Sequence, residues 1–419
     1  MQTQRRNFRL AVANGVVMIG SNTSLSSPEL VLTAFAAHLT DNPLILGLIA
    51  PLYPATWTLP QLWMVGRLNT ARRALPFYTV AALVRVVAWI GLIITMLLVR
   101  DNTVLLVALL LHTVVAGTAA GFAGLPFTEV VAKTIQPRQR GLVFGLRNAL
   151  GGALGILGAQ VVILLTGPGS WFDFPVNYAL LFLLALVVQS IGIVCFAKIK
   201  EPSADPKQKH LQPSLGVLRK LWHTDANLRH FLRGRTYFVL SSMANGLIIV
   251  YGNHVLGVRL ELAGVYLVAG TVMRPIMALV GGRLSMRFGS RLPVSAGLVV
   301  QAFTWGLLLV AHPLGIQDRA AEYFLFVIYS LYAAQAGLVA SSLMALGLNV
   351  VPTQERALYL GAVNTFVGLV TLVSAFSGAV VELTGFDVLF AITMLFACLA
   401  GWEFWLLNEK LEAAPDGSA

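Results

Sequence analysis

Long apolar stretches alternate with short polar connections along most of this chain. A bilayer core about 30 Å thick requires roughly 20 apolar residues for each spanning helix. Twelve stretches meet this requirement, and turn residues or charges bound them. The pattern predicts an all-α integral membrane protein with spans near residues 10–38, 44–66, 76–99, 103–130, 141–165, 175–198, 236–255, 261–282, 293–312, 321–350, 357–381 and 387–407.

One connection differs from the others because it is long, polar and basic. Within it, Leu215, Leu218, Leu221 and Trp222 recur at helical spacing, which predicts an amphipathic helix on the membrane surface. We therefore expect an N-terminal six-helix bundle, a cytoplasmic linker, a C-terminal six-helix bundle and a cytoplasmic tail. These parts cover residues 1–199, 200–234, 235–407 and 408–419, respectively.

Composition and charge agree with lipid as the main solvent. Hydrophobic residues make up 57% of the chain and charged residues 11%, whereas soluble domains carry about 25% charged residues.

Of the 29 Lys and Arg, only Arg100, Arg259 and Arg319 fall in the odd-numbered connections. The positive-inside rule then predicts a multi-pass protein of the plasma (inner) membrane with both termini in the cytoplasm. Topology accounts for the net charge of +11, so we expect no nucleic-acid partner.

An internal repeat relates the two halves of the chain. Gly66-Arg67-Leu68 and Gly282-Arg283-Leu284 are separated by 216 positions. The same separation relates four further residues of the first half to four of the second: Arg140, Gly145, Asn148 and Gly152 match Arg356, Gly361, Asn364 and Gly368. A constant separation across several loops and helices predicts two six-helix halves with a common origin.

The run from Gly282 to Arg291 carries a family resemblance. It reads G-R-L-S-M-R-F-G-S-R and resembles the signature loop of the major facilitator superfamily, G-x-L-x-D-R-x-G-R-R. It lies between the eighth and ninth predicted spans, where that family has a copy of the loop. The resemblance implies two helix bundles that rock about a central cavity and expose one site alternately to each side.

The chain departs from this resemblance at the loop aspartate, which is Met286 in the second copy and Thr70 in the first. In the family that carboxylate helps to hold the inward gate closed, so we expect Glu129 to replace it as a partner of Arg67 or Arg73. The residues expected in the gating loops are Gly66, Arg67, Arg73, Glu129, Arg140, Gly282, Arg283, Arg287, Arg291 and Arg356. The arginine that similar proton-coupled drug exporters carry in helix four is Thr113 here, which weakens a drug-antiporter assignment.

Ionisable groups at membrane depth are costly and usually functional. Glu29 is the only carboxylate well inside a predicted span, and His112 lies at similar depth in the fourth span. Both helices line the cavity in the resembled fold, so these two residues are candidates for proton coupling. The alternative is that Glu29 reaches the outer interface and His112 satisfies a backbone carbonyl.

Further polar residues are candidates for the substrate cavity. Arg274, beside the helix-breaking Pro275, offers a planar fork of donors for an anion, or alternatively binds a carbonyl that the proline frees. Asn22, Asn148 and Asn364 are the other candidates, although hydrogen bonds between helices explain such residues equally well.

Motifs of soluble enzymes do not occur in the sequence. There is no phosphate-binding loop ending in Lys-Ser or Lys-Thr, no His/Cys cluster with metal-ligand spacing and no G-x-S-x-G elbow. We therefore expect no enzyme activity, no metal and no cofactor. The expected function is secondary transport of a small organic solute, coupled to protons and directed outwards, by a monomer in the lipid bilayer. The alternatives are uniport or exchange of an organic anion, and a lipid-handling or sensor protein with the same fold.

Overall fold

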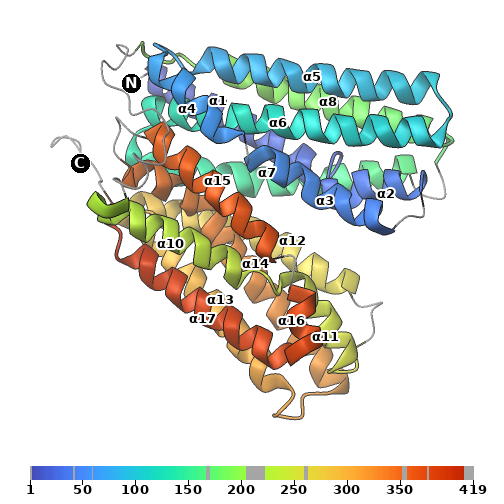
Figure 1. Cartoon of the computed structure of the whole chain (residues 1–419), viewed down its shortest axis with the longest axis vertical. Helices are drawn as coiled ribbons and strands as arrows, with labels where there is room; N and C mark the ends of the chain where they lie inside the picture. Colours follow the sequence, from blue (N-terminus) through green and yellow to red (C-terminus); the bar gives the residue numbers. More distant parts are fainter. Residues whose placement is uncertain are drawn as a thin grey trace. The chain divides into compact units, whose positions relative to one another are not determined.

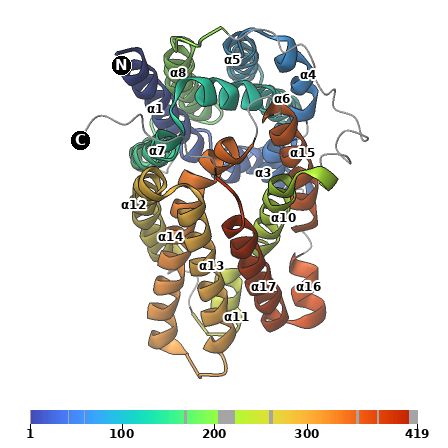
Figure 2. The same cartoon turned by 90° about the vertical axis from the view of Figure 1, so that its left-hand side faces the viewer.

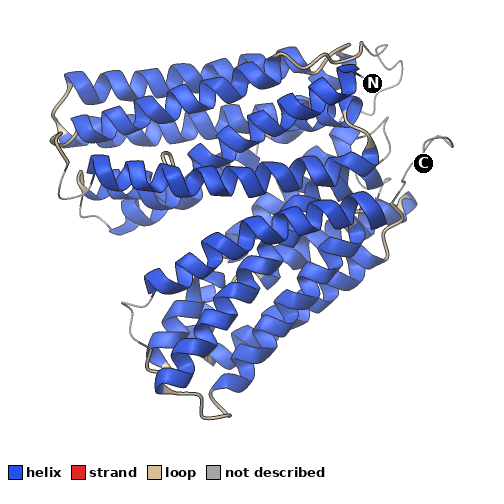
Figure 3. Ribbon diagram, turned by 180° about the vertical axis from the view of Figure 1, so that it is seen from behind, coloured by secondary structure: helices blue, strands red, loops and turns tan. Residues whose placement is uncertain are grey.

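The computed structural model describes residues 2–40, 43–58, 60–166, 170–203, 222–258, 263–351, 356–374 and 377–409. Within these ranges the secondary structure is helical and contains no strand (Figures 1 and 3). Each of the twelve predicted stretches corresponds to one helix or to a helix broken into two or three pieces. The prediction of an all-α membrane fold is therefore confirmed.

Six predicted spans fall in the first half of the sequence, and two of them are broken. The first span breaks after Thr23, before Pro28, and the second breaks just before Gln61. Proline lacks the N–H that continues a helix, which accounts for the second break, since Pro60 precedes Gln61. The elements are α1 (Gln2–Thr23), η1 (Pro28–Leu32), α2 (Thr33–Ala37), α3 (Pro43–Thr58), α4 (Gln61–Thr70), α5 (Leu75–Leu98), α6 (Asn102–Thr134), α7 (Pro137–Thr166) and α8 (Val176–Ala197).

The second half of the sequence also contains broken spans. The seventh predicted span is divided between two helices and a short 3₁₀ turn, and the eleventh is divided between two helices. The elements are α10 (Ala226–Ser241), η2 (Asn245–Leu247), α11 (Ile248–His254), α12 (Ala263–Phe288), α13 (Arg291–Ala311), α14 (Asp318–Val350), α15 (Arg356–Ser374), α16 (Ser377–Thr384) and α17 (Phe386–Trp405).

Seven helices in the described part of the chain are long and apolar enough to span a membrane unaided: α5, α6, α7, α8, α13, α14 and α17. The remaining spans are mostly built from shorter pieces. A reading by total apolar length runs across these breaks, although polar residues such as Ser21, Ser26, Ser241 and Ser242 mark two of them. Breaks of this kind are tolerated in membrane proteins where neighbouring groups satisfy the freed backbone.

The chain forms two compact units. Unit 1 consists of Met1–Gln136, Leu150–Val217 and Gln354–Thr365, and unit 2 of Pro137–Ala149, Leu218–Thr353 and Phe366–Ala419. The start of α7 therefore belongs to unit 2, and the start of α15 belongs to unit 1.

Aromatic side chains form the core of each unit. In unit 1 the rings of Phe35 and Phe174 lie 5.5 Å apart between centroids. In unit 2 the rings of Tyr251 and Phe390 lie 5.0 Å apart. The second pair is found 216 positions after the first, so the repeat extends into the packing of both cores. Figure 2 shows α13 and α17 side by side in unit 2, where Trp305 of α13 stacks on Phe390 of α17.

The seventh span begins earlier than the apolar pattern predicts. Asp225 caps the N-terminus of α10 by accepting a hydrogen bond from the backbone N–H of Leu228 at 3.0 Å. The helix therefore starts at Ala226 and includes Arg235, which the sequence pattern assigns to the end of the connection. Leu215, Leu218 and Leu221 of the predicted surface helix lie outside the described residues, so that prediction stays open.

Candidate functional site

Polar side chains gather at the break of the first span in unit 1. The Nε2 group of Gln189 on α8 donates to Oγ of Ser26 at 3.0 Å, to Oγ of Ser21 at 3.2 Å and to Oδ1 of Asn22 at 3.4 Å. The Oε1 atom of the same glutamine accepts from Nη2 of Arg85 on α5 at 3.0 Å. One glutamine thus connects the broken helix to the half-buried guanidinium group of Arg85.

A similar arrangement holds the break of the seventh span in unit 2. The carbonyl oxygen of Ser241 accepts from Nε2 of Gln301 at 3.1 Å and from Nε1 of Trp305 at 3.0 Å. Gln301 also donates to Oγ of Ser242 at 3.3 Å. Two side chains of α13 therefore satisfy the backbone where α10 ends, as a break at membrane depth requires.

The side chains at the two breaks come from positions related by the repeat. Gln301 and Trp305 follow Arg85 and Trp89 by 216 positions. Trp89 packs on His112 with the ring centroids 4.0 Å apart, whereas Trp305 stacks on Phe390. Arg85 and Gln301 therefore carry polar contacts at equivalent positions, but Gln189 of α8 contacts the first break directly, whereas α13 contacts the seventh.

Some buried polar atoms near these breaks have no hydrogen-bond partner within the described ranges. They are Oε1 of Gln301, Oδ1 of Asn245 and Nδ1 of His112. Gln301 itself is only 1% exposed. Unpaired polar atoms are rare in folded proteins and mark positions where a ligand, an ion or water can bind.

A chain of ion pairs connects the end of α6 with the start of α15 in unit 1. Oε1 of Glu129 lies 3.5 Å from Nζ of Lys133, and Oε2 of Glu129 lies 3.5 Å from Nη1 of Arg356. Glu129 and Arg356 are 8% and 5% exposed, so water screens this pair less than a surface pair. Arg356 comes from the second half of the sequence and Glu129 from the first.

Glu201 extends this network to the start of α5. Its Oε1 atom lies 3.1 Å from Nζ of Lys133. The two carboxylate oxygens also accept the backbone N–H groups of Ala74 at 2.9 Å and Leu75 at 2.8 Å. A carboxylate at a helix N-terminus is favoured by both the free N–H groups and the helix dipole.

Unit 2 contains the counterpart of this network. Oε2 of Glu409 accepts the backbone N–H of Arg291 at 3.1 Å, at the start of α13. Oε1 of Glu409 accepts from Nδ2 of Asn349 at 2.8 Å, and Oδ1 of Asn349 accepts from Nη1 of Arg140 at 2.6 Å. Arg291, Asn349 and Arg356 follow Leu75, Lys133 and Arg140 by 216 positions. Each unit therefore joins a helix-capping carboxylate, a residue at the end of a long helix and an arginine from the other half of the sequence.

The expected partner of Glu129 is corrected by these contacts. Glu129 pairs with Lys133 and Arg356, and the prediction that it pairs with Arg67 or Arg73 is wrong. The physical reason is position, because Lys133 lies one helical turn further along α6 on the same face. Arg67 and Arg73 are exposed.

Glycines in the predicted gating loops allow close helix packing. A Cβ atom on Gly282 would lie 2.9 Å from the carbonyl oxygen of Gly141 and 3.1 Å from Cα of Gly145. Those distances are too short for a side chain, so glycine permits α12 to approach the start of α7 within unit 2. Of the other loop residues, Gly66 is half-buried and Arg283 and Arg287 are exposed.

The other predicted cavity residues have separate surroundings. Asn148 donates to the carbonyl of Phe144 in its own helix at 2.8 Å, and Asn364 donates to Oε1 of Gln61 at 2.7 Å. The Arg274 side chain is exposed. The structure therefore does not bring these residues together in one described site.

The proposed coupling pair is described in part. Glu29 lies in η1, and its side chain lies outside the described part of the structure. His112 is buried against Trp89, next to the polar cluster that contains Arg85. The contact between Glu29 and His112 therefore stays a prediction.

Sequence reasoning missed several residues of these networks. They are Lys133, Gln189, Glu201, Gln301, Trp305, Asn349 and Glu409. The repeat could have indicated Gln301 and Trp305, because they follow Arg85 and Trp89 by 216 positions.

Membrane helices broken at buried polar clusters, arranged in two compact units with matching internal contacts, define a multi-pass membrane transport protein. The chain belongs to the family of MFS/sugar transport proteins, whose model matches residues 63–387. No curated protein sequence gives a match.

Solved structures of low sequence identity share the fold. A bacterial homologue of the iron transporter ferroportin, in an outward-facing state, is 16% identical with a TM-score of 0.72, covering 95% of this chain and 98% of that one. The proton:xylose symporter XylE bound to 6-bromo-6-deoxy-D-glucose is 13% identical with a TM-score of 0.71, covering 97% and 96%. The ferroportin homologue with soaked iron gives a TM-score of 0.68 at 13% identity, covering 95% and 98%.

Proposed function

We propose that this protein is a secondary active transporter that exports a small organic solute in exchange for protons by alternating access. The observation that carries the proposal is the pair of contacts between the two sequence halves, Arg356 with Glu129 and Arg140 with Asn349. A transporter that rocks between two states needs contacts that close one side and break when that side opens. Charge-assisted hydrogen bonds suit this role because they are strong while the partners are held together, and water can hydrate both groups once that side opens.

The basic character of this end of the molecule supports a cytoplasmic position for the proposed gate. Within unit 1, Arg67 lies in the last turn of α4, and Arg72 and Arg73 lie in the connection from α4 to α5. The positive-inside rule favours a cytoplasmic position for such basic segments, which supports the proposal that both termini lie there as well.

The break in the seventh span, within unit 2, is the proposed position of the substrate site. Broken helices expose backbone groups and polar side chains at membrane depth, where transporters bind their substrates. Oε1 of Gln301 and Oδ1 of Asn245 are acceptors available to such a ligand. Glu29 and His112 are the proposed proton-coupling residues, and the similarity in fold to a proton:xylose symporter supports testing sugars among the substrates.

A second candidate function, uniport or exchange of an organic anion, is favoured by Arg235. This arginine lies inside α10, and its buried Nε atom has no hydrogen-bond partner among the described residues. A guanidinium group offers a planar set of donors that matches a carboxylate or phosphate.

Proton flux into proteoliposomes tests the proposal. The purified full chain would be challenged with cationic drugs, organic anions and sugars while a pH-sensitive dye reports the lumen. Proton movement triggered by one solute class supports coupled transport and identifies that class. Uptake of a labelled anion without proton movement favours the second candidate. Absence of both signals, with folding and orientation verified, contradicts solute transport and favours a lipid-handling or sensor protein.

A further inference from the structure

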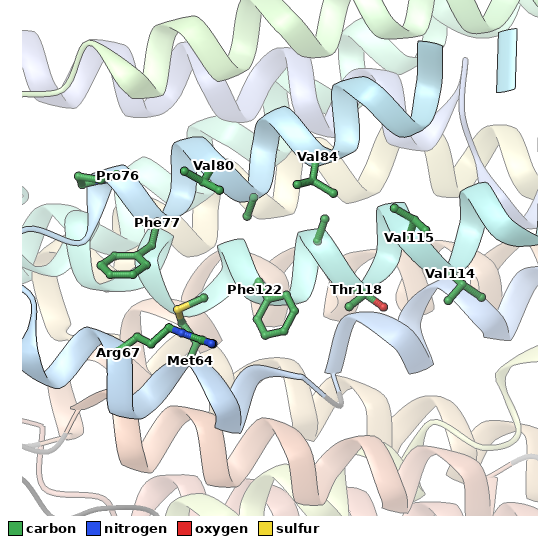
Figure 4. Close-up of a pocket in the computed structure, with 12 residues that line it drawn as sticks. Met64, Arg67, Pro76, Phe77, Val80, Val84, Val114, Val115, Thr118 and Phe122 are labelled. Carbon is green, nitrogen blue, oxygen red and sulfur yellow. The ribbon is translucent and has the colours of Figure 1, made fainter. Parts of the chain in front are cut away.

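A groove of about 710 Å³ lies between α4 and α5 and across α6 in unit 1 (Figure 4). This volume is within the range of small-molecule binding sites. Only Arg67 and Thr118 among its lining residues are polar. The lining residues are Met64, Arg67, Pro76, Phe77, Val80, Ala81, Val84, Val114, Val115, Thr118, Ala119 and Phe122.

The groove has a charged end and an apolar end. Arg67 lies in the last turn of α4, and Pro76 lies in the first turn of α5. Val84 lies two turns further along α5, about 12 Å from Pro76 at the helical rise per residue. Figure 4 shows Arg67 near Phe77 at one end, Val84 further along α5, and Val114 at the other end. Because α5 is an apolar span, the groove extends from the membrane interface into the hydrocarbon.

Arg67 lies at the charged end, and Arg72 and Arg73 follow it in the connection from α4 to α5. Arg67, Arg72 and Arg73 are all exposed, and none of them pairs with a carboxylate in the part of the chain that the structure describes. The buried Arg356 differs because Glu129 already holds it. The three exposed cations are therefore available to an anion, and a guanidinium group binds the oxygens of a phosphate in a bidentate manner.

We propose that this groove holds one anionic phospholipid of the surrounding bilayer as a stationary ligand. The lipid phosphate binds Arg67, with Arg72 and Arg73 beside it, and one acyl chain lies along the apolar wall from Phe77 to Val84. Both parts of the groove support this ligand. A soluble anion would leave the apolar wall uncovered, and a purely apolar partner would leave the guanidinium groups unpaired.

The position of the groove gives the lipid a structural role. α4 is the second piece of a broken span and begins only at Gln61. An acyl chain in the groove contacts α4 and the continuous helices α5 and α6, and these contacts hold the three helices together. The lipid therefore stabilises α4 against its neighbours, independently of which solute the protein transports.

Native mass spectrometry of the full chain, released from micelles that contain phosphatidylglycerol and phosphatidylcholine, tests this assignment. We expect one phosphatidylglycerol to remain bound in preference to phosphatidylcholine. Arg67→Gln removes a charge-assisted contact and should weaken binding about tenfold. The matched control is Arg283→Gln, since Arg283 follows Arg67 by 216 positions and is also exposed.

A second pair of variants tests the apolar wall. Val84→Trp fills the apolar part of the groove and should reduce lipid retention. Val87→Trp, on the same helix and 67% exposed outside the groove, should not.

Equal retention of both lipids, or equal loss in both arginine variants, would overturn the assignment. Competition by inorganic phosphate alone would indicate a soluble-anion site and overturn the lipid assignment. Movement of labelled phosphatidylglycerol between leaflets that is lost in Arg67→Gln would indicate a transported lipid and overturn its stationary role.

Discussion

Arg356 and Glu129 lie far apart in the sequence, yet Nη1 of the arginine is 3.5 Å from Oε2 of the glutamate. Lys133 approaches the other carboxylate oxygen of Glu129 to the same distance. Both members of the Arg356–Glu129 pair are buried, so removal of one leaves a charge in a poorly hydrated position. This relationship ties the start of α15 to the end of α6 and is the basis of the proposed gate.

Replacement of Arg356 by alanine should open the proposed gate more often. Loss of a charge-assisted hydrogen bond corresponds to about 1.5–3 kcal/mol, or at least about a tenfold rise in the open population. Hydrogen–deuterium exchange of the segment that includes Thr128 and Thr134 should rise accordingly. Arg138→Ala, at an exposed arginine in the first turn of α7, is the control and should leave exchange unchanged. Equal exchange in the wild type and the Arg356 variant would contradict the role of this pair.

Glu201 should stabilise unit 1 through its two backbone contacts. Glutamine at this position retains one acceptor oxygen, so one of the N–H groups of Ala74 and Leu75 loses its partner, and Lys133 loses one of its two ion pairs and keeps the one with Glu129. We expect a loss of about 1–3 kcal/mol in unfolding free energy, measured by thermal unfolding in detergent. Glu382→Gln, at an exposed glutamate, should have no measurable effect. A melting temperature of Glu201→Gln equal to that of the control would refute this role.

The break in the seventh span should depend on its two donors from α13. The double variant Gln301→Leu with Trp305→Phe leaves the carbonyl oxygen of Ser241 without either donor. A buried acceptor without a partner costs about 1–3 kcal/mol, so the melting temperature should fall by several degrees. Trp402→Phe, at a tryptophan that is 63% exposed, serves as the control. Equal melting of the double variant and the control would show that the break needs no such support.

The proton-coupling proposal makes a separate prediction for Glu29. Glutamine has nearly the same shape but does not ionise, so Glu29→Gln should remove the dependence of solute flux on a pH gradient and leave solute binding intact. The measurement is flux in proteoliposomes with and without an imposed gradient. Glu322→Gln, in the first turns of α14, provides a carboxylate control. Unchanged pH dependence in Glu29→Gln would exclude Glu29 as the coupling residue.

Most of the fold could be predicted from the sequence because lipid imposes a minimum apolar length on every span. The breaks could not be predicted in the same way. The first break coincides with a polar run, Ser21-Asn22-Thr23-Ser24 followed by Ser26-Ser27-Pro28, but a span read by its length alone does not use this signal. The start of α10 was also missed, because Asp225 caps the helix ahead of its apolar part.

Less of the candidate site could be predicted, because its residues contact partners that lie far away in the sequence. The repeat indicated Arg140 and Arg356, but their partners are set by tertiary contacts over more than two hundred positions. Glu201 and Glu409 lie in connections, where a carboxylate usually faces solvent and carries no pattern. The positions of Gln301 and Trp305 could have been found by following the separation of 216 positions into the third and ninth spans.

Reversible cross-linking of the proposed gate tests the central claim most directly. Glu129→Cys and Arg356→Cys would be introduced into a chain whose Cys195 and Cys398 are replaced by serine. The thiols would then be joined by a reducible bifunctional reagent, because side chains this long separate their backbones further than a disulfide spans.

Solute flux in proteoliposomes, measured before cross-linking, after it and after reduction, is the decisive quantity. The control joins Arg6→Cys to Lys198→Cys, two positions whose native residues are hydrogen-bonded within the first half of the sequence. Loss of flux on cross-linking of the Glu129 and Arg356 positions, recovery on reduction and unchanged flux in the control are the predicted results. Undiminished flux with the Glu129 and Arg356 positions fully cross-linked would contradict alternating access through this gate.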